Sequence, residues 1–149
     1  MRVRALQCLA RREYSRAELR VRLLRYATEN TDSGQNANLD ALLDDLTARG
    51  WLSDERAATQ LLHARSNRFG ALRIVQELRM KGIAEHLIDN VLPELHETEL
   101  GRARIVWLKK FGALPLDVRE KARQMRFMQS RGFGLDVILE VLRLDQAES

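Results

Sequence analysis

The sequence predicts an all-α protein: a tandem array of three three-helix repeats with about nine helices, elongated and with its curvature left open. Three observations support this fold class. Apolar residues recur at helical spacing along almost the whole chain of 149 residues. The composition favours helix over strand, because hydrophobic residues make up 45% while aromatic residues make up only 5% and there are two prolines. A pattern of basic and acidic stretches recurs three times, which is typical of stacked similar units.

The first repeat is predicted over residues 1–51. An apolar stripe around Leu6 and Leu9 indicates its first helix, and Ser15-Arg16-Ala17-Glu18 forms a capping box that starts the second. In such a box each of the two end residues accepts a hydrogen bond from the backbone amide of the other. The polar stretch 28–38 predicts a loop, after which a third helix runs to Gly50, a residue suited to the left-handed position behind a helix.

The second and third repeats are predicted over residues 52–95 and 96–149, within a single domain of residues 1–149. A cap at Ser53 or Asp54 starts the second repeat, and Gly82 and Gly132 each end a helix. One helix is expected to end near Pro93, because proline cannot donate the hydrogen bond that a helix interior needs. The apolar periodicity places the helices near residues 57–65, 71–80, 84–92, 98–110, 117–130 and 135–144.

Self-similarity between the second and third repeats supports the array. The tetrapeptide of residues 69–72 (FGAL) recurs as residues 111–114, and a shift of 50 residues pairs Leu78 with Met128 and Gly82 with Gly132. The first repeat matches more loosely. Because one triplet of short helices buries little apolar surface, we expect the triplets to stack into a continuous core.

Charge repeats with the same period. Successive stretches carry net charges of +6, −6, +5, −5, +7 and −3, within a total of +4: residues 1–26, 27–55, 56–82, 83–101, 102–131 and 132–149. The first two helices of each repeat are therefore basic and the third is acidic. If the repeats stack in register, one side of the array is basic and could face an anionic partner. The alternative is that these charges only solvate helix faces and pair with one another between stretches.

Residue patterns that indicate catalysis or metal binding are missing from the sequence. There is no phosphate-binding or dinucleotide-binding glycine pattern, and His63, His86 and His96 show no metal-ligand spacing with Cys8, the only cysteine. Cys8 lies among leucines and is expected to be a buried thiol in a reducing compartment. We therefore expect a protein that is not an enzyme and that uses no cofactor or metal.

The remaining features concern membranes and aromatic residues. No apolar run approaches the roughly 20 residues of a bilayer span, and no signal peptide is evident, so we expect a cytoplasmic protein without a membrane partner. Trp51 and Trp107 are expected in the core rather than stacked on nucleic-acid bases.

Four motifs follow one another in a specific order. They are SxxELRxxL at residues 15–23, GWLxDER at 50–56, FGxxRIxxELRxKGI at 69–83 and KAxxxRFxxxRGF at 121–133. Together they resemble the RecX family, regulatory proteins of the RecA recombinase. The resemblance covers nearly the whole chain, and the order of the four motifs is more specific than any one of them.

The resemblance implies a non-enzymatic inhibitor of RecA that binds the groove of the RecA–DNA filament and restrains filament growth, ATPase activity and strand exchange. It also implies weaker, sequence-independent binding to single- and double-stranded DNA, and we expect a monomer. Taken with the charge pattern, it makes a set of basic residues the candidate contacts with RecA or DNA: Arg16, Arg20, Arg65, Arg68, Arg73, Arg79, Lys81, Lys109, Lys110, Arg119, Lys121, Arg123, Arg126 and Arg131.

Two other functions fit the same residues. A general DNA-binding helical protein acting without RecA would bind naked DNA tightly and would be indifferent to RecA. A protein–protein adaptor with another acidic partner would have negligible affinity for DNA even at low salt. RecA-dependent ATP hydrolysis on single-stranded DNA at several salt concentrations, measured beside DNA binding without RecA, separates the three.

Overall fold

The chain folds into α-helices. The computed structural model describes residues 1–29 and 36–148, and over these ranges it contains eight helices and no strand, which confirms the all-α class. The central residues 30–35 of the predicted loop 28–38 lie outside the described residues. The helices are α1 (Arg2–Arg11), α2 (Arg16–Glu29), α3 (Asn36–Ala48), α4 (Asp54–Arg65), α5 (Ala71–Met80), α6 (Glu85–Lys110), α7 (Val118–Ser130) and α8 (Leu135–Glu148).

The prediction of nine helices is corrected by α6. The helices predicted near 84–92 and 98–110 are one continuous helix, which passes through Pro93. Proline inside a helix removes one hydrogen bond and costs about 3 kcal/mol. Ile88 and Leu95, on either side of Pro93, are both buried in the same hydrophobic cluster. Packing of both halves on one core offsets the local preference to end the helix there.

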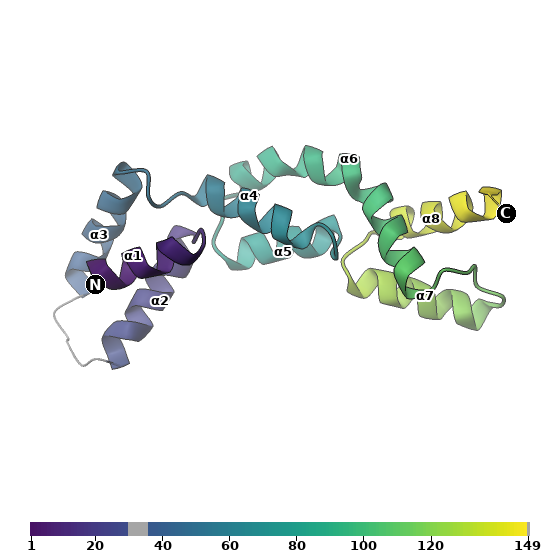
Figure 1. Cartoon of the computed structure of the whole chain (residues 1–149), viewed down its shortest axis with the longest axis horizontal. Coiled ribbons are helices and arrows are strands. Elements are labelled where there is room, and N and C mark those ends of the chain that lie inside the picture. The colour runs from purple at the N-terminus through teal and green to yellow at the C-terminus, as the bar shows by residue number, and fades with distance from the viewer. Residues whose placement is uncertain (30–35, 149) are drawn as a thin grey trace.

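The helices form an extended row with three hydrophobic clusters along it (Figure 1). The first cluster draws on α1, α2 and α3, and the second on α4, α5 and the N-terminal half of α6. The third draws on the C-terminal half of α6 together with α7 and α8. The α6 helix therefore belongs to two cores and joins them rigidly. The repeat boundaries at 51/52 and 95/96 stay a prediction.

Figure 1 also shows how the helices are distributed around the long axis. The second helix of each triplet, which is α2, α5 or α7, lies along the lower side of the row. The third helical segment of each triplet, formed by α3, the N-terminal half of α6 and α8, lies along the upper side. The basic second helices thus follow one edge of the molecule.

Local signals in the sequence set most helix ends. Ser15 and Glu18 form the predicted capping box, with the Glu18 amide donating to Ser15 Oγ and the Ser15 amide donating to Glu18 Oε1, both at 3.0 Å. The side chains of Ser53 and Asp117 cap α4 and α7. Gly50, Gly82 and Gly132 have positive φ angles of 77°, 75° and 91°, as their positions behind helices require.

The two tryptophans behave differently. Trp107 is buried, as predicted, and its indole nitrogen donates to Gln124 Oε1 at 2.8 Å. The prediction of a buried Trp51 is wrong, because its side chain is 46% exposed and the Arg49 guanidinium lies over its ring. The next residue, Leu52, takes the buried position against α3, with its amide donating to the Leu46 carbonyl.

The two FGAL tetrapeptides have different structures. Gly70 is the N-cap of α5 with an extended backbone, whereas Gly112 follows the end of α6 with a φ of 70°. The helix α5 begins directly after Gly70, but α7 begins six residues after Gly112. Both copies lie at the junction of the first and second helices of a triplet. The repeated tetrapeptide therefore marks the same position in two triplets, although its backbone conformation differs between them.

Candidate functional site

The predicted contact residues fall into two groups, according to whether a carboxylate of the chain already pairs with them. Six of the fourteen have a carboxylate oxygen within 4.0 Å: the pairs are Arg16–Asp44, Arg20–Asp40, Arg65–Glu77, Arg79–Glu85, Lys81–Glu18 and Arg123–Glu120. The two pairs in the first triplet join basic α2 to acidic α3. Four of these pairs join different stretches, as in the alternative of pairing between stretches, whereas Arg65–Glu77 and Arg123–Glu120 each lie within one stretch.

The other eight predicted residues are the cations of this set that remain available. Among the described residues, no carboxylate lies within 4.0 Å of their charged groups. They are Arg68, Arg73, Lys109, Lys110, Arg119, Lys121, Arg126 and Arg131, and six of them belong to the end of α6, to α7 or to the turn behind α7. Within this predicted set, the unpaired positive charge is therefore concentrated in the third triplet and at its junction with the second.

On α7, the three predicted arginines of one helix face differ in their surroundings. Arg123 forms a bidentate pair with Glu120, with both hydrogen bonds at 2.9 Å. The hydrogen bonds from Arg123 lower the pKa of Glu120, and the Glu120 carboxylate raises the pKa of Arg123. Arg119 and Arg126, four residues before and three residues after Arg123, are exposed and lack such a partner within the described chain. Their charges are directed to solvent.

The ring of Phe69 gathers cations from three segments. The guanidinium carbons of Arg68, Arg73 and Arg131 lie 5.7, 4.1 and 5.5 Å from its centroid. Arg131 also lies 5.1 Å from the ring centroid of Phe127. The face of an aromatic ring attracts cations, and so it holds these charges close together where mutual repulsion would separate them.

Phe127 extends this cationic cluster toward the end of α6. Lys110 Nζ lies 5.2 Å from the Phe127 centroid, and the ring of Phe111 meets that of Phe127 edge-on at 5.4 Å between centroids. We call Arg68, Phe69, Arg73, Lys110, Phe127 and Arg131 the junction cluster. It places four unpaired cations across the boundary between the second and third triplets.

The boundary between the second and third triplets is held by a close approach of two backbone segments. The Gly70 amide donates to the Arg131 carbonyl at 2.8 Å, and the Leu72 amide donates to the Gly132 carbonyl at 3.1 Å. A Cβ at Gly70 would lie 2.4 Å from the carbonyl oxygen of Gly132, so only glycine fits. The N-terminal turn of α5 is therefore held against the turn that ends α7, which brings Arg73 and Arg131 to the same ring.

Two polar side chains of α6, the buried Glu99 and the half-buried Arg102, hold the loop that carries Phe69. Arg102 donates to the carbonyls of Ser66 and Phe69 at 2.8 and 2.7 Å, and Glu99 Oε1 accepts from the Ala71 amide at 3.2 Å. Burial lowers the pKa of Arg102, while the charge of Glu99 opposes that change. Both side chains act on the backbone around Phe69 and so position the junction cluster.

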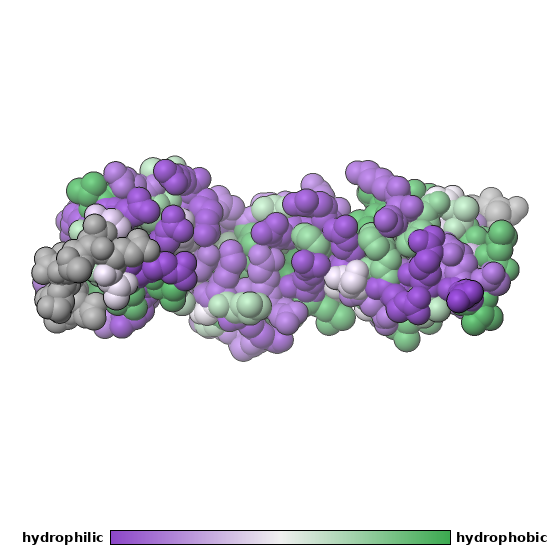
Figure 2. Space-filling model, turned by 90° about the horizontal axis from the view of Figure 1, so that it is seen from below, coloured by the Kyte–Doolittle hydropathy of each residue, from purple (hydrophilic) through white to green (hydrophobic). Residues whose placement is uncertain are grey.

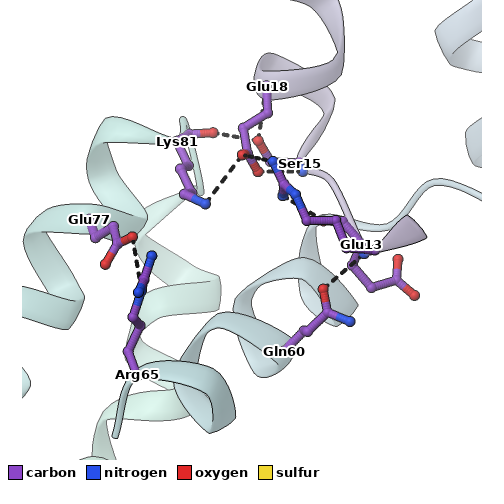
Figure 3. A network of polar contacts seen from close by, with 8 residues as sticks. Glu13, Ser15, Glu18, Gln60, Arg65, Glu77 and Lys81 are labelled. Carbon is purple, nitrogen blue, oxygen red and sulfur yellow. Dashed lines mark hydrogen bonds and ion pairs between the residues drawn. The ribbon is translucent and has the colours of Figure 1, made fainter. Parts of the chain in front are cut away.

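The boundary between the first and second triplets is built from polar contacts (Figure 3). Ser15 Oγ donates to the Lys81 carbonyl at 2.6 Å, Lys81 Nζ lies 3.2 Å from Glu18 Oε2, and the Glu13 amide donates to Gln60 Oε1 at 2.8 Å. Burial by itself would raise the pKa of Glu18, but hydrogen bonds from the Ser15 amide and Arg12, with the charge of Lys81, outweigh it and lower that pKa.

The aromatic members of the junction cluster escaped the sequence analysis. Phe69 and Phe127 are half-buried, and a hydropathy pattern does not distinguish them from core residues. Two weak signals were present, because Phe69 precedes a glycine and Phe127 lies four residues before Arg131, the C-cap of its helix. That Arg131 reaches both rings depends on the backbone contact at Gly70 and Gly132, which no local pattern encodes.

Over residues 1–29 and 36–148, no group of three or more histidine, cysteine, aspartate or glutamate residues is placed to hold a metal ion. In the same ranges no helix has the length and apolar character needed to cross a membrane.

The fold, the junction cluster and the exposed cations of α7 define a helical-repeat protein that carries unpaired positive charge at the boundary between its second and third triplets and on α7. Two family models match the chain, one described as the second three-helix domain of RecX over residues 53–92 and one as the third over residues 97–142. A regulatory protein RecX from Leptothrix cholodnii is 48% identical over 145 residues, which cover 97% of this chain and 88% of that protein. One from Chromobacterium violaceum is 42% identical, covering 95% and 88%. The chain belongs to the RecX family.

Solved structures agree with this fold. The crystal structure of RecX from Lactobacillus salivarius superposes with a TM-score of 0.75 at 14% identity, covering 95% of this chain and 92% of that one. A second crystal structure, of a regulatory protein RecX, gives a TM-score of 0.76 at 20% identity and covers 94% and 70%.

Proposed function

We propose that this protein is a non-enzymatic regulator of RecA that binds the groove of the RecA–DNA filament and restrains filament growth, ATPase activity and strand exchange. It acts as a cytoplasmic monomer without a cofactor, and it binds free single- and double-stranded DNA more weakly and without sequence preference. The names of its relatives, regulatory proteins RecX at up to 48% identity, support the RecA-directed part of the proposal.

The observation that carries the proposal is the set of cations without a carboxylate partner among the described residues. Exposed cations on α7, together with the junction cluster, offer charge that the chain does not neutralise itself. Such groups suit phosphates or acidic protein surface, and their contacts with phosphates are independent of base sequence and weaken as salt rises.

The extended shape is the second support. A row of three helical cores can contact several protomers of a helical filament at once, whereas a compact domain of the same mass would contact fewer (Figure 1). Several weak contacts on one rigid chain give an avidity that no single triplet has. A protein held in the groove in this way resists both the addition of protomers and their rearrangement during ATP hydrolysis.

The test compares unpaired with paired cations at equal change of charge. In one variant Arg119, Lys121 and Arg126 become glutamine, and in the control variant Arg16, Arg20 and Arg79 become glutamine. We expect the first to inhibit RecA-dependent ATP hydrolysis about tenfold less well and to lower the salt slope of binding by about two units, because it loses phosphate contacts. The control, whose cations already have carboxylate partners, should stay within about threefold of the parent protein.

The remaining outcomes separate the alternatives. If both variants lost inhibition of RecA equally, the distinction between paired and unpaired cations, on which the proposed binding surface depends, would be refuted. Tight binding to naked DNA with no effect of RecA would point to a general DNA-binding protein. Inhibition of RecA without measurable DNA binding at low salt would restrict the surface to protein contacts.

A further inference from the structure

Three large aliphatic side chains are exposed on the side of the molecule that carries α2 and α5. Met80 is 82% exposed, Leu72 65% and Val21 55%. Figure 2 views the molecule from this side and shows patches of hydrophobic surface between hydrophilic ones. Each of these residues sits on a helix whose opposite face already supplies the core, so the fold does not need them to be apolar.

The three side chains line two hollows on this side of the molecule. A hollow of about 590 Å³ is lined by Leu72, Arg73 and Met80, and reaches the turn at Gly132. A second hollow of about 300 Å³ is lined by Val21 and again by Met80. Met80 borders both hollows, so they lie next to each other along α2 and α5, and we call the pair the α2–α5 groove. It crosses the polar boundary between the first two triplets.

The charge around this groove is positive. Its two carboxylates are neutralised within the chain, since Glu77 pairs with Arg65 at 3.4 Å and Glu18 pairs with Lys81 at 3.2 Å and with Arg12. By contrast, Arg22, Arg25 and Arg73 also line the groove, and within the described part of the chain no carboxylate lies within 4.0 Å of any of them. The groove thus combines exposed aliphatic side chains with cations that lack a counter-charge.

This combination distinguishes a protein ligand from a nucleic acid. Phosphates would use the arginines but gain nothing from valine, leucine or methionine, and nucleic-acid bases stack on aromatic rings rather than on aliphatic side chains. An acidic segment of a protein with apolar residues at helical spacing would use both features. Leu72 and Met80 are eight residues apart on α5, which corresponds to about 12 Å along its axis and to two turns of a partner helix.

We propose that the α2–α5 groove binds an acidic, amphipathic segment of a protein partner, with Val21, Leu72 and Met80 receiving its apolar side chains. This proposal rests on the proposed function in one respect, because it assigns the groove to the protein component of the filament. Phe69 and Arg73 border this groove as well, so the other cations of the junction cluster, with α7, are left for phosphates. Regulation by this protein therefore uses two surfaces with different salt dependence.

The test replaces the three aliphatic side chains and leaves the cations in place. In the groove variant Val21, Leu72 and Met80 become glutamine, and in a matched control Val3, Ile105 and Leu139, which are exposed on α1, α6 and α8, become glutamine. We expect the groove variant to bind the RecA–DNA filament at least about tenfold more weakly, while its affinity for single-stranded DNA changes less than about twofold. The control should match the parent protein in both, and circular dichroism should show equal helicity throughout.

A peptide probe tests the groove without RecA. The probe is a labelled acidic helical peptide with leucine at every fourth position, and its twin carries glutamine in place of leucine. The parent protein should prefer the leucine peptide at least about fivefold, and the groove variant should lose that preference. Preference for this peptide without any effect on RecA would refute the proposed function and leave the groove assignment standing.

Three results would overturn the groove assignment. One is filament and peptide binding that the groove substitutions do not change. Another is an equal loss of DNA binding, which would make the groove part of the nucleic-acid surface. The third is a groove variant that differs from the parent protein only in self-association by sedimentation, which would identify a second copy of this chain as the occupant.

Discussion

At the scale of single residues, Gly132 makes the closest approach of the described glycines, and it makes it to α5. Its φ of 91° lies in the left-handed region, and a Cβ placed there would lie 2.3 Å from Cβ of Arg73 and 2.7 Å from the Arg73 amide nitrogen. A side chain would therefore meet both backbone strain and a steric overlap with the helix that carries the junction cluster. Among the described residues, Gly101 within α6 is a contrasting helical glycine with open space around its Cβ position.

We predict that Gly132→Ala lowers the free energy of unfolding by about 2–4 kcal/mol, since the strain and the overlap act together. Gly101→Ala should raise it by about 0.5–1 kcal/mol, because alanine restricts the unfolded chain and suits a helix interior. Urea unfolding followed by circular dichroism measures both. A Gly132→Ala protein as stable as the parent would mean that the two turns are not in close contact.

At the scale of elements, α6 is the helix that organises the site. It contributes to two cores, continues through Pro93, and places Glu99 and Arg102 against the loop that carries Phe69. Glu99 is buried, and its carboxylate stands between the Ala71 amide and the charge of Arg102. Removing that carboxylate leaves a buried amide without its acceptor and a half-buried guanidinium without its nearest counter-charge.

We predict that Glu99→Ala destabilises the protein by about 2–4 kcal/mol for this reason. Glu99→Gln keeps an oxygen acceptor for the Ala71 amide, so its loss should be about half as large. Glu97→Ala on an exposed face of the same helix is the control and should change stability by less than about 0.5 kcal/mol. Thermal unfolding at pH 7 would contradict this ranking if Glu97→Ala were as damaging as Glu99→Ala.

At the scale of the whole molecule, the two boundaries between triplets differ in kind. The second and third triplets share α6 and a backbone contact between glycines. The first and second are joined by the segment after α3 and by side-chain contacts around Glu18 and Lys81 (Figure 3). The ion pair between Glu18 and Lys81 depends on charge, and it weakens when salt screens it or acid neutralises Glu18. The first triplet is therefore the part of the array whose orientation can adapt to a partner.

We predict that acid loosens the first boundary and leaves the second intact. The pKa of Glu18 is lower in the folded protein than its ordinary value of 4.5, so its contacts stabilise the boundary above that pH and are lost as pH falls through the folded pKa. Spin labels at Ala41 and Thr59 should give a distance distribution that broadens as the pH falls through this lowered pKa. Labels at Thr59 and Leu139, across the second boundary, should give an unchanged one.

Glu18→Gln supplies the control for this experiment. Its distance distribution at pH 7 should already resemble that of the parent protein in acid, and it should change little when the pH is lowered. Broadening across both boundaries at once would indicate general acid unfolding rather than the loss of one ion pair.

The sequence by itself determined most of the fold. The capping box at Ser15, the cap at Ser53 and the glycines behind α3, α5 and α7 act within a few residues of their own position, which is why periodicity and cap chemistry located them. The charge of each stretch was likewise readable from the sequence. Pro93 was misread because a local rule for ending helices was overridden by packing on both sides of it.

Only the tertiary structure decided which positive charges lack a carboxylate partner and so remain available to bind another molecule. Arg16 and Arg20 belong to the most basic part of the first triplet, yet carboxylates of α3 pair with them, whereas Arg73 and Arg131 meet at one ring although 58 positions separate them. Pairing between residues so far apart depends on how helices stack, and stacking is set by the summed packing of whole cores. No pattern within a single helix carries that information, so the sequence could supply the candidates but not choose among them.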